Sequence, residues 1–302
     1  MGEELEKIAE LAALIGRMTG SDGGFVPLDG VHLYRQSAQT EPVHGLYEAS
    51  LCVVAQGRKE LLLGGEPFVY DPDSYLLVSA ALPVSTRVIA ASPDRPCLCV
   101  GLPLDAALVR SVLVEAGQPA GGNGLGAVRA LDVGVLEPEL LDAVVRIIRL
   151  LDSPEHARML IPLAMREIVY RLLVGGQGAR LRQIAVSGSK LPHVAGAIEW
   201  LRLHFDQPLG VEALAAEVGM STSGLRHHFK AVTALSPLQF QKQLRLQEAR
   251  RLMVSGGLDA AGAGFRVGYD DPSHFSREYR RMFGAPPRRD VTQMRNSLAG
   301  VL

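Results

Sequence analysis

The 302-residue sequence has few of the features that mark secreted, zinc-binding or membrane proteins. Its three cysteines, Cys52, Cys97 and Cys99, cannot all pair within one chain, and their spacing does not resemble a zinc ligand set. No apolar run approaches the roughly 18–20 residues that span a bilayer. The N-terminal stretch lacks the basic start and unbroken apolar core of a signal peptide. We therefore expect a cytoplasmic protein with no membrane segment.

Catalytic motifs are also scarce. The sequence contains no nucleophile elbow, phosphate loop or H-E-x-x-H helix. Only His32, His44 and His156 precede residue 190, and they are far apart. The stretch GGNGLGA at 121–127 satisfies a dinucleotide-binding fingerprint, but it follows EAGQPA instead of a strand, which favours a surface loop. We expect no catalytic residue, no metal ligand and no cofactor.

The net charge of −1 conceals two halves of opposite sign. Residues 1–189 contain 16 Lys and Arg against 22 Asp and Glu, whereas residues 190–302 contain 15 against 10. A basic domain joined to an acidic one is typical of a nucleic-acid-binding protein with a separate regulatory module. At about 100–200 residues for a domain, the length also favours two domains.

The N-terminal half predicts a helix followed by a β-rich domain. We expect an N-terminal helical segment over 1–30 and an antiparallel barrel over 31–136, because short apolar or alternating runs there are separated by turn residues. The expected strands are 51–55, 60–63, 67–70, 75–79, 86–90 and 97–102. Four aromatic residues are candidates for lining a ligand pocket in this barrel: Tyr47, Phe68, Tyr70 and Tyr75.

The period becomes helical from residue 139 to 174, which predicts a helical connector over 137–189. In it Leu140, Val144, Ile147 and Leu151 share one face, which is a candidate dimer seam. Upstream, Cys97 and Cys99 lie two apart on one expected strand, so both side chains should point to the same face. They are candidates either for sensing oxidants or electrophiles, or, as we favour, for small core residues.

The C-terminal segment 190–302 predicts an all-α domain with two helix-turn-helix units. In the first unit, 211–237, Leu225 and Phe229 belong to the seam between two helices, and Gly219 makes the turn. The second helix of such a unit enters the DNA major groove. The residues left on its outer face, together with the residue that begins it, are Ser221, Ser223, Arg226, His227 and Lys230.

The second unit, 264–287, has the same pattern. Phe275, Tyr279 and Phe283 recur at intervals of four and form a buried stripe. A cluster of arginines on the opposite face indicates an anionic partner. The candidate DNA-binding residues of this unit are Ser273, His274, Arg277, Arg280 and Arg281.

These residues resemble a known family. From about His193 to Arg289 the chain resembles the DNA-binding domain of the AraC/XylS transcription regulators, with VGYDDPSHFSREYRRMFGAPP close to the family signature and SPLQFQKQLRLQEARRLM similar to its linker helix. Upstream, YEASLCVVAQGRKELLLGGEPFVYDPDSYLLVSAALPV resembles the cupin-type N-terminal domain of one branch of these regulators. The resemblance implies a sensor fold and names no ligand.

One segment departs from the family. Where relatives carry a solid helix before the second turn, this chain has LDAAGAGFRVGY, with Gly262 and Gly264 inside it. A glycine in a helix interior costs about 1 kcal/mol relative to alanine. We therefore expect a weak helix, and we expect alanine at either position to stabilise it by about 0.4–1 kcal/mol.

The sequence thus predicts an α+β protein: a cupin-like antiparallel β-barrel, a helical connector and an all-α domain with two helix-turn-helix units. The expected function is sequence-specific transcription regulation, as activator or repressor, with double-stranded DNA bound through its major groove and a small-molecule effector bound in the barrel. Homodimerisation and contact with RNA polymerase are further expected partnerships. Two alternatives stay open: a cupin-type metalloenzyme with a basic appendage, and a DNA-binding scaffold whose barrel only dimerises.

Overall fold

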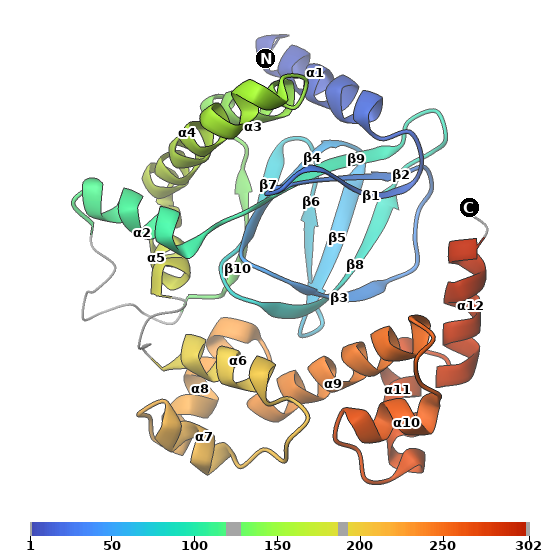
Figure 1. The fold of residues 1–302 in the computed structure, drawn as a ribbon. Coiled ribbons are helices and arrows are strands. Elements are labelled where there is room, and N and C mark those ends of the chain that lie inside the picture. The colour runs from blue at the N-terminus through green and yellow to red at the C-terminus, as the bar shows by residue number, and fades with distance from the viewer. Residues whose placement is uncertain (1, 119–127, 187–192, 300–302) are drawn as a thin grey trace. The chain divides into compact units, whose positions relative to one another are not determined.

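The computed structural model describes residues 2–118, 128–186 and 193–299 (Figure 1). The chain divides into two compact units. The first comprises residues 1–195 with 231–234, and the second comprises residues 196–230 and 235–302. The expected boundary at residue 190 lies outside the described residues, as does the stretch 121–127 with its dinucleotide-like fingerprint.

Two antiparallel sheets form the body of the N-terminal unit (Figure 1). The six-stranded sheet has the order β1 (Gly23–Leu28), β2 (Val31–Gln36), β9 (Cys97–Pro103), β4 (Ser50–Gln56), β7 (Ser74–Val78), β10 (Leu131–Val135). The four-stranded sheet has the order β3 (Val43–Tyr47), β8 (Leu82–Ala90), β5 (Arg58–Leu63), β6 (Glu66–Tyr70). The predicted antiparallel β domain is confirmed, and all six expected strands are present.

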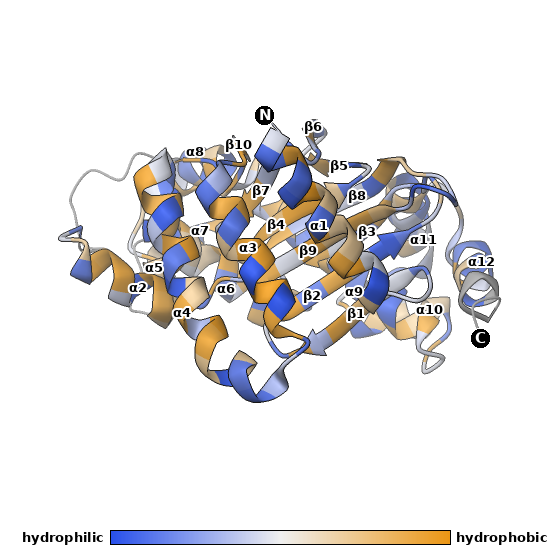
Figure 2. Cartoon of the chain, turned by 90° about the horizontal axis from the view of Figure 1, so that it is seen from above, coloured by the Kyte–Doolittle hydropathy of each residue, from blue (hydrophilic) through white to orange (hydrophobic). Residues whose placement is uncertain are grey.

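Helices cover the outer face of the six-stranded sheet (Figure 1). They are α1 (Gly2–Met18), α2 (Ala106–Glu115), α3 (Pro138–Leu150), α4 (Pro154–Leu172), a π-helical turn η1 (Leu173–Gln177) and α5 (Gly178–Val186). Leu11 and Ile15 of α1 join Leu98 and Val100 of β9 and Ile147 of α3 in one buried cluster. Hydrophobic and hydrophilic residues form separate stripes on α1 and α3 (Figure 2), so burial of the apolar stripe explains their place on the sheet.

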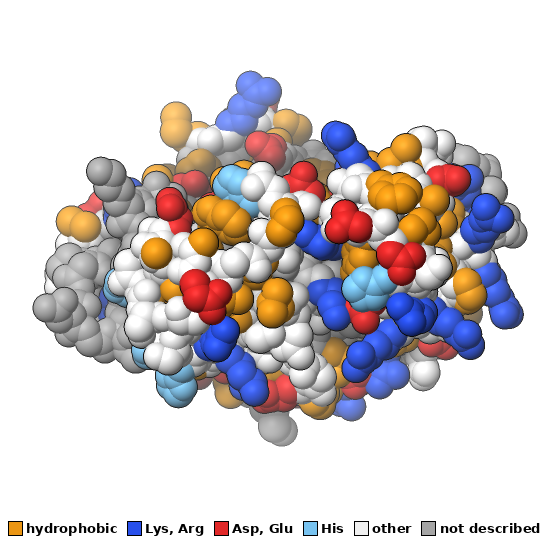
Figure 3. Space-filling model, turned by 90° about the horizontal axis from the view of Figure 1, so that it is seen from below, with side chains coloured by type: hydrophobic (Ala, Val, Ile, Leu, Met, Phe, Trp, Pro, Cys, Tyr) orange, Lys and Arg blue, Asp and Glu red, His pale blue; other side chains and the backbone are white. Residues whose placement is uncertain are grey.

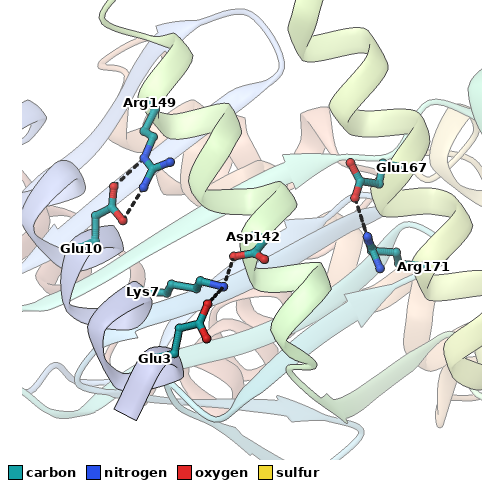
Figure 4. Close-up of polar contacts among 7 residues, drawn as sticks. All are labelled: Glu3, Lys7, Glu10, Asp142, Arg149, Glu167 and Arg171. Atoms are coloured by element: carbon teal, nitrogen blue, oxygen red, sulfur yellow. Dashed lines mark hydrogen bonds and ion pairs between the residues drawn. The ribbon is translucent and has the colours of Figure 1, made fainter. Parts of the chain in front are cut away.

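Ion pairs connect α1 to α3 at their solvent-facing edges (Figure 4). The Lys7 ammonium lies 2.8 Å from Asp142, and this contact raises the pKa of Lys7. Glu10 accepts two hydrogen bonds from Arg149, at 2.5 and 2.7 Å, and this contact lowers the pKa of Glu10. Exposed pairs of this kind contribute little, so the apolar cluster is the main reason that α1 stays on the sheet.

Three sequence-based expectations need correction. The N-terminal helix ends at Met18 and not near residue 30: Gly20, Gly23 and Gly24 follow, glycine is unfavourable in a helix, and the chain continues as strand β1. The expected connector is not a separate segment: α3 and α4 belong to the core of the N-terminal unit. Consequently the face with Leu140, Val144 and Ile147 is buried within the chain and is not a dimer seam.

The C-terminal unit is helical. Its elements are α6 (Val194–Leu203), α7 (Val211–Glu217), α8 (Thr222–Thr233), α9 (Pro237–Val254), α10 (Ala260–Arg266), α11 (Pro272–Phe283) and α12 (Pro287–Ala299). Helix α9 begins with a capping box, in which the Ser236 hydroxyl accepts from the Gln239 amide while the Gln239 side chain accepts from the Ser236 amide. The predicted all-α domain with two helical pairs is confirmed, and α12 is an addition.

Candidate nucleic-acid interface and barrel cavity

Helices α7 and α8 form the first helix-turn-helix unit. Gly219 makes the turn between them with a φ of +68°, a left-handed conformation that favours glycine. Ser221 begins α8, where its hydroxyl accepts a 3.1 Å hydrogen bond from the Gly224 amide. Leu225 and Phe229 are fully buried, which fixes the rotation of α8 about its axis.

The opposite face of α8 is exposed. It carries the predicted residues Ser223, Arg226, His227 and Lys230. The Arg226 guanidinium lies 3.4 Å from the Glu212 carboxylate of α7, and both side chains are largely exposed. This exposed pair can open at little cost, which leaves Arg226 free to contact an anionic partner.

Helices α10 and α11 form the second unit. Asp271 caps α11 by accepting hydrogen bonds from the amides of Ser273, at 2.8 Å, and His274, at 3.1 Å. These bonds lower the pKa of the Asp271 carboxyl. Phe275 and Tyr279 are fully buried and stack edge to face, with ring centroids 5.6 Å apart.

The exposed face of α11 carries all five predicted residues of the second unit: Ser273, His274, Arg277, Arg280 and Arg281. Among the residues that the structure describes, no carboxylate forms an ion pair with Arg277, Arg280 or Arg281. Lys and Arg side chains gather over this unit, on the right of Figure 3. A short face with three unpaired arginines is suited to a polyanion such as the DNA backbone.

A buried triad that sequence analysis missed holds the second unit to its neighbours. Arg250 of α9 donates two 2.8 Å hydrogen bonds to the Asp290 carboxylate of α12, and the Tyr279 hydroxyl of α11 donates a third at 2.7 Å. Burial raises the pKa of Tyr279, and the hydrogen bond to Asp290 raises it further. The triad thus joins three helices at one point.

Arg245 of α9 is a second residue that sequence analysis missed. Its guanidinium donates to the backbone carbonyls of Phe205, Gln207 and Gly268 at 2.6, 2.7 and 2.8 Å. Burial lowers the pKa of Arg245. One side chain thereby connects the segment before α7 with the turn between α10 and α11, and so links the two helix-turn-helix units.

The glycines of α10 differ in their surroundings. A Cβ atom at Gly264 would lie 3.0 to 3.3 Å from three atoms of Phe275, whereas one at Gly262 would meet only the Asp259 carboxylate at 3.1 Å and the side chain of Leu258 beyond it. Gly264 therefore lets α10 approach α11 closely. The geometry contradicts our expectation that alanine would stabilise the helix at Gly264.

Gly264→Ala is accordingly expected to lower the free energy of unfolding by about 1–2 kcal/mol. Overpacking costs about 1–3 kcal/mol, which exceeds the gain of about 0.4–1 kcal/mol from a less flexible unfolded chain. Gly262→Ala is the matched control: its Cβ would meet only the side chains of Asp259 and Leu258, so the close Asp259 contact offsets part of the expected gain, and the net effect should lie between neutral and a stabilisation of about 1 kcal/mol. Urea denaturation of both variants tests this, and a Gly264→Ala variant as stable as wild type would contradict the close approach.

The N-terminal unit contains a cavity of about 730 Å³. It is lined from both sheets, mostly by apolar atoms, with a few polar groups such as Tyr34 and Lys59. Of the four predicted aromatic residues, Tyr47 lines this cavity. Tyr70 is buried at the end of β6, an edge strand of the four-stranded sheet, and Phe68 lies beside Arg129.

Tyr75 lies on the helix-covered side of the six-stranded sheet, where its hydroxyl accepts a 3.1 Å hydrogen bond from Gln177. The three cysteines are free thiols, and Cys52 and Cys99 line the cavity. Burial raises the pKa of the Cys97 thiol to about 12 and that of Cys52 to about 11. Both are therefore uncharged at neutral pH, which disfavours a role as reactive thiolates.

Two further features bear on the alternatives. Within the described ranges, no group of three or more His, Cys, Asp or Glu side chains is arranged to hold a metal ion. Of the helices in those ranges, none is both long and apolar enough to cross a membrane.

Comparison with known proteins agrees with this architecture. Residues 27–180 match the family described as AraC-type transcriptional regulator N-terminus, and residues 214–292 match the helix-turn-helix domain family. The transcriptional activator RhaS of Klebsiella pneumoniae (strain 342) is 26% identical over 273 residues, which are 87% of this chain and 91% of that protein.

Solved structures of ToxT from Vibrio cholerae share the fold. The apo K231A protein superposes with a TM-score of 0.56 at 10% identity over 88% of this chain and 98% of ToxT. The unsaturated-fatty-acid-bound wild-type protein superposes with a TM-score of 0.54 at 11% identity over 86% and 94%. Since one family match alone spans half of the sequence, the chain belongs to the AraC-type transcriptional regulators and is a DNA-binding regulator of transcription.

Proposed function

We propose that the protein regulates transcription by inserting α8 and α11 into two successive major grooves on one face of DNA, about 34 Å apart. The observation that carries this proposal is the exposed face of α11, where three arginines lack acidic partners among the described residues. The similar face of α8 and the Arg245 link between the units support a common orientation.

The two units divide recognition between bases and phosphates. Arg226, His227 and Arg277 lie toward the N-terminal or middle part of their helices, so they are our candidates for contacts with base edges. Arg280 and Arg281 lie one turn further along α11 and are our candidates for phosphate contacts. Ser221, Ser223, Lys230, Ser273 and His274 complete the proposed interface.

Arg226→Ala is expected to weaken binding to the selected DNA site by about 1–3 kcal/mol and to relax preference at one base pair. The reason is that a guanidinium can donate two hydrogen bonds to the major-groove edge of guanine, and the other bases do not offer the same two acceptors. Binding titrations on the site and on random DNA measure the effect. Arg202→Ala, which removes a partly buried arginine that pairs with Glu199 on α6, is the control. Equal losses on both DNAs would overturn the assignment of Arg226.

Replacing both Arg280 and Arg281 by alanine is expected to weaken binding to all sequences alike. The plot of log K against log salt has a negative slope, and each lost phosphate contact makes it less steep by about 1. For the double variant, the slope should therefore be about 2 less steep than for the wild type. Binding measured over a series of salt concentrations tests this. An unchanged slope with altered sequence preference would show that these arginines contact bases instead.

We further propose that a small molecule bound in the 730 Å³ cavity controls this activity. A mostly apolar cavity of this size with a few polar groups has the character of a ligand site. The ToxT neighbour whose structure contains an unsaturated fatty acid supports a ligand-binding role for the fold. The protein is then a regulator and not an enzyme. If no ligand of the cavity altered DNA affinity, the scaffold alternative would be favoured.

Homodimerisation and contact with RNA polymerase belong to the same proposal. With the face of α3 buried, the outward face of α4 is the better candidate for a second copy, because Met159, Leu163 and Tyr170 are exposed there. On the same helix, Glu167 and Arg171 pair with each other (Figure 4). Sedimentation of the full chain measures its oligomeric state, and a monomer at micromolar concentration would contradict a stable dimer.

A further inference from the structure

Lys59 occupies a position of strand β5 at which the alternation of buried and exposed residues predicts an apolar side chain. Strand β5 alternates, so that Lys59, Leu61 and Leu63 are buried while Arg58 is exposed and Glu60 is partly exposed. Lys59 lines the barrel cavity with only 8% of its surface exposed. Lysine is almost never this deeply buried unless its charge has a partner.

The ammonium group of Lys59 has no such partner within the described part of the chain. It donates to the Cys99 sulfur at 3.8 Å, and it lies 4.8 Å from the centroid of the Tyr34 ring. No described carboxylate lies within 4.0 Å of it. Sulfur is a weak acceptor, so the three N–H donors of Lys59 lack a strong acceptor. Such a charge is unfavourable until an anion joins it.

Tyr70 lies behind Lys59, outside the lining of the cavity. It stands directly opposite Lys59 in the pairing of β5 with β6, and opposed residues project to the same face of a sheet. Its side chain is 1% exposed, and its hydroxyl has no hydrogen-bond partner among the described residues. Tyr70 therefore contributes no negative charge or acceptor that would satisfy the Lys59 ammonium.

The position of Lys59 suits an anionic ligand. Burial opposes its ammonium form and is the largest influence on its pKa. The neighbouring thiol and phenol side chains favour the ammonium only when they are themselves ionised. An anion bound beside Lys59 would supply the opposite charge that a buried ammonium needs.

Most of the remaining lining is apolar, with Glu48 and a few uncharged polar side chains among it, and suits an apolar body. Valine side chains lie along its edge, where Val26 is 61% and Val43 51% exposed. The other strongly basic residue of the lining, Arg87, already donates to Glu60 at 2.8 and 3.0 Å. Of these two basic residues, only Lys59 has no carboxylate partner among the described residues, so Lys59 is the one available to an anionic ligand.

We propose that the cavity binds an apolar monocarboxylate whose carboxylate accepts hydrogen bonds from the Lys59 ammonium. This inference rests on the proposed role of the cavity as the effector site, and it names the chemical class of the effector. It also assigns Lys59 as the residue that selects acids over neutral molecules of the same shape.

Calorimetric titration of the full chain with matched acids and alcohols tests the proposal. The probes are octanoate, dodecanoate, palmitate and naphthaleneacetate, each against the alcohol of the same skeleton. We expect at least one acid to bind about tenfold or more tightly than its alcohol, because hydrogen bonds to a buried charge are strong. Lys59→Met should abolish this preference, whereas Arg58→Met, which removes the exposed neighbouring cation, should keep it.

The unliganded Lys59→Met protein is expected to melt at a higher temperature than wild type, since methionine removes an unpaired buried charge. Equal affinity for acid and alcohol in the wild type, no binding of any acid, or an intact preference in Lys59→Met would each overturn the proposal.

Measuring DNA affinity with and without the bound acid separates the two levels of the hypothesis. An acid that binds through Lys59 without changing DNA affinity would sustain the site and refute the effector role. A neutral molecule that alters DNA affinity while no acid binds would support the effector role of the cavity and refute the proposed acid site.

Discussion

Replacing Arg250 by alanine is expected to destabilise the C-terminal unit by about 3–5 kcal/mol, since breaking a buried ion pair leaves one charge without compensation. The side chains of Arg250 and Asp290 are only 15% and 9% exposed, and the Tyr279 hydroxyl shares the same carboxylate. The loss would be a large fraction of the roughly 5–15 kcal/mol that keeps a domain folded. Thermal and urea unfolding of the full chain would show it as an early transition.

Arg251→Ala is the matched control for this experiment. Arg251 is the next residue of α9, and it forms an ion pair with Glu248 on the exposed side of the same helix. Its removal should therefore leave the transition almost unchanged. If the two variants unfolded alike, the triad would not be what holds α9, α11 and α12 together.

Gly268→Ala is expected to have the second large effect, a destabilisation of about 2–5 kcal/mol. The residue has a φ of +88°, and a Cβ atom there would lie 2.0 Å from the Asp206 carbonyl oxygen. Strain from a left-handed alanine contributes about 1–2 kcal/mol, and the displacement of packed neighbours adds about 1–3 kcal/mol. Because Arg245 bonds to both sides of this contact, the displacement should also weaken DNA binding.

The equivalent turn of the first unit supplies the comparison. Gly219 has a φ of +68°, but nothing lies within 4 Å of the position that its Cβ would take. Gly219→Ala should therefore incur the conformational strain alone, about 1–2 kcal/mol. Unfolding measurements that gave equal losses for the two glycines would contradict the contact between Gly268 and the segment before α7.

The helix-turn-helix faces were predictable because their signal is local. On α11, Phe275 and Tyr279 recur with the helical period, so the arginines between them had to lie on the opposite face. The six predicted strands had an equally local signal in alternation and turn residues. By contrast, β1 has the sequence GGFVPL and no fully buried residue, so neither its period nor its composition identified it.

The residues that connect distant segments were beyond sequence analysis. Arg250 and Asp290 are 40 positions apart, and nothing in one sequence shows that their side chains meet. Lys59 did have a local signal, since it continues the alternation of Leu61 and Leu63. A lysine at the end of a strand is usually solvated, however, and only the sheet packing shows that it points inward.

Footprinting the full chain on DNA fragments selected from a random pool tests the central claim most directly. Hydroxyl-radical cleavage should show each chain protecting two successive major grooves on one face, about 34 Å apart. Protection of a single groove per chain, or the absence of any selected sequence, would contradict a regulator that reads DNA through both α8 and α11.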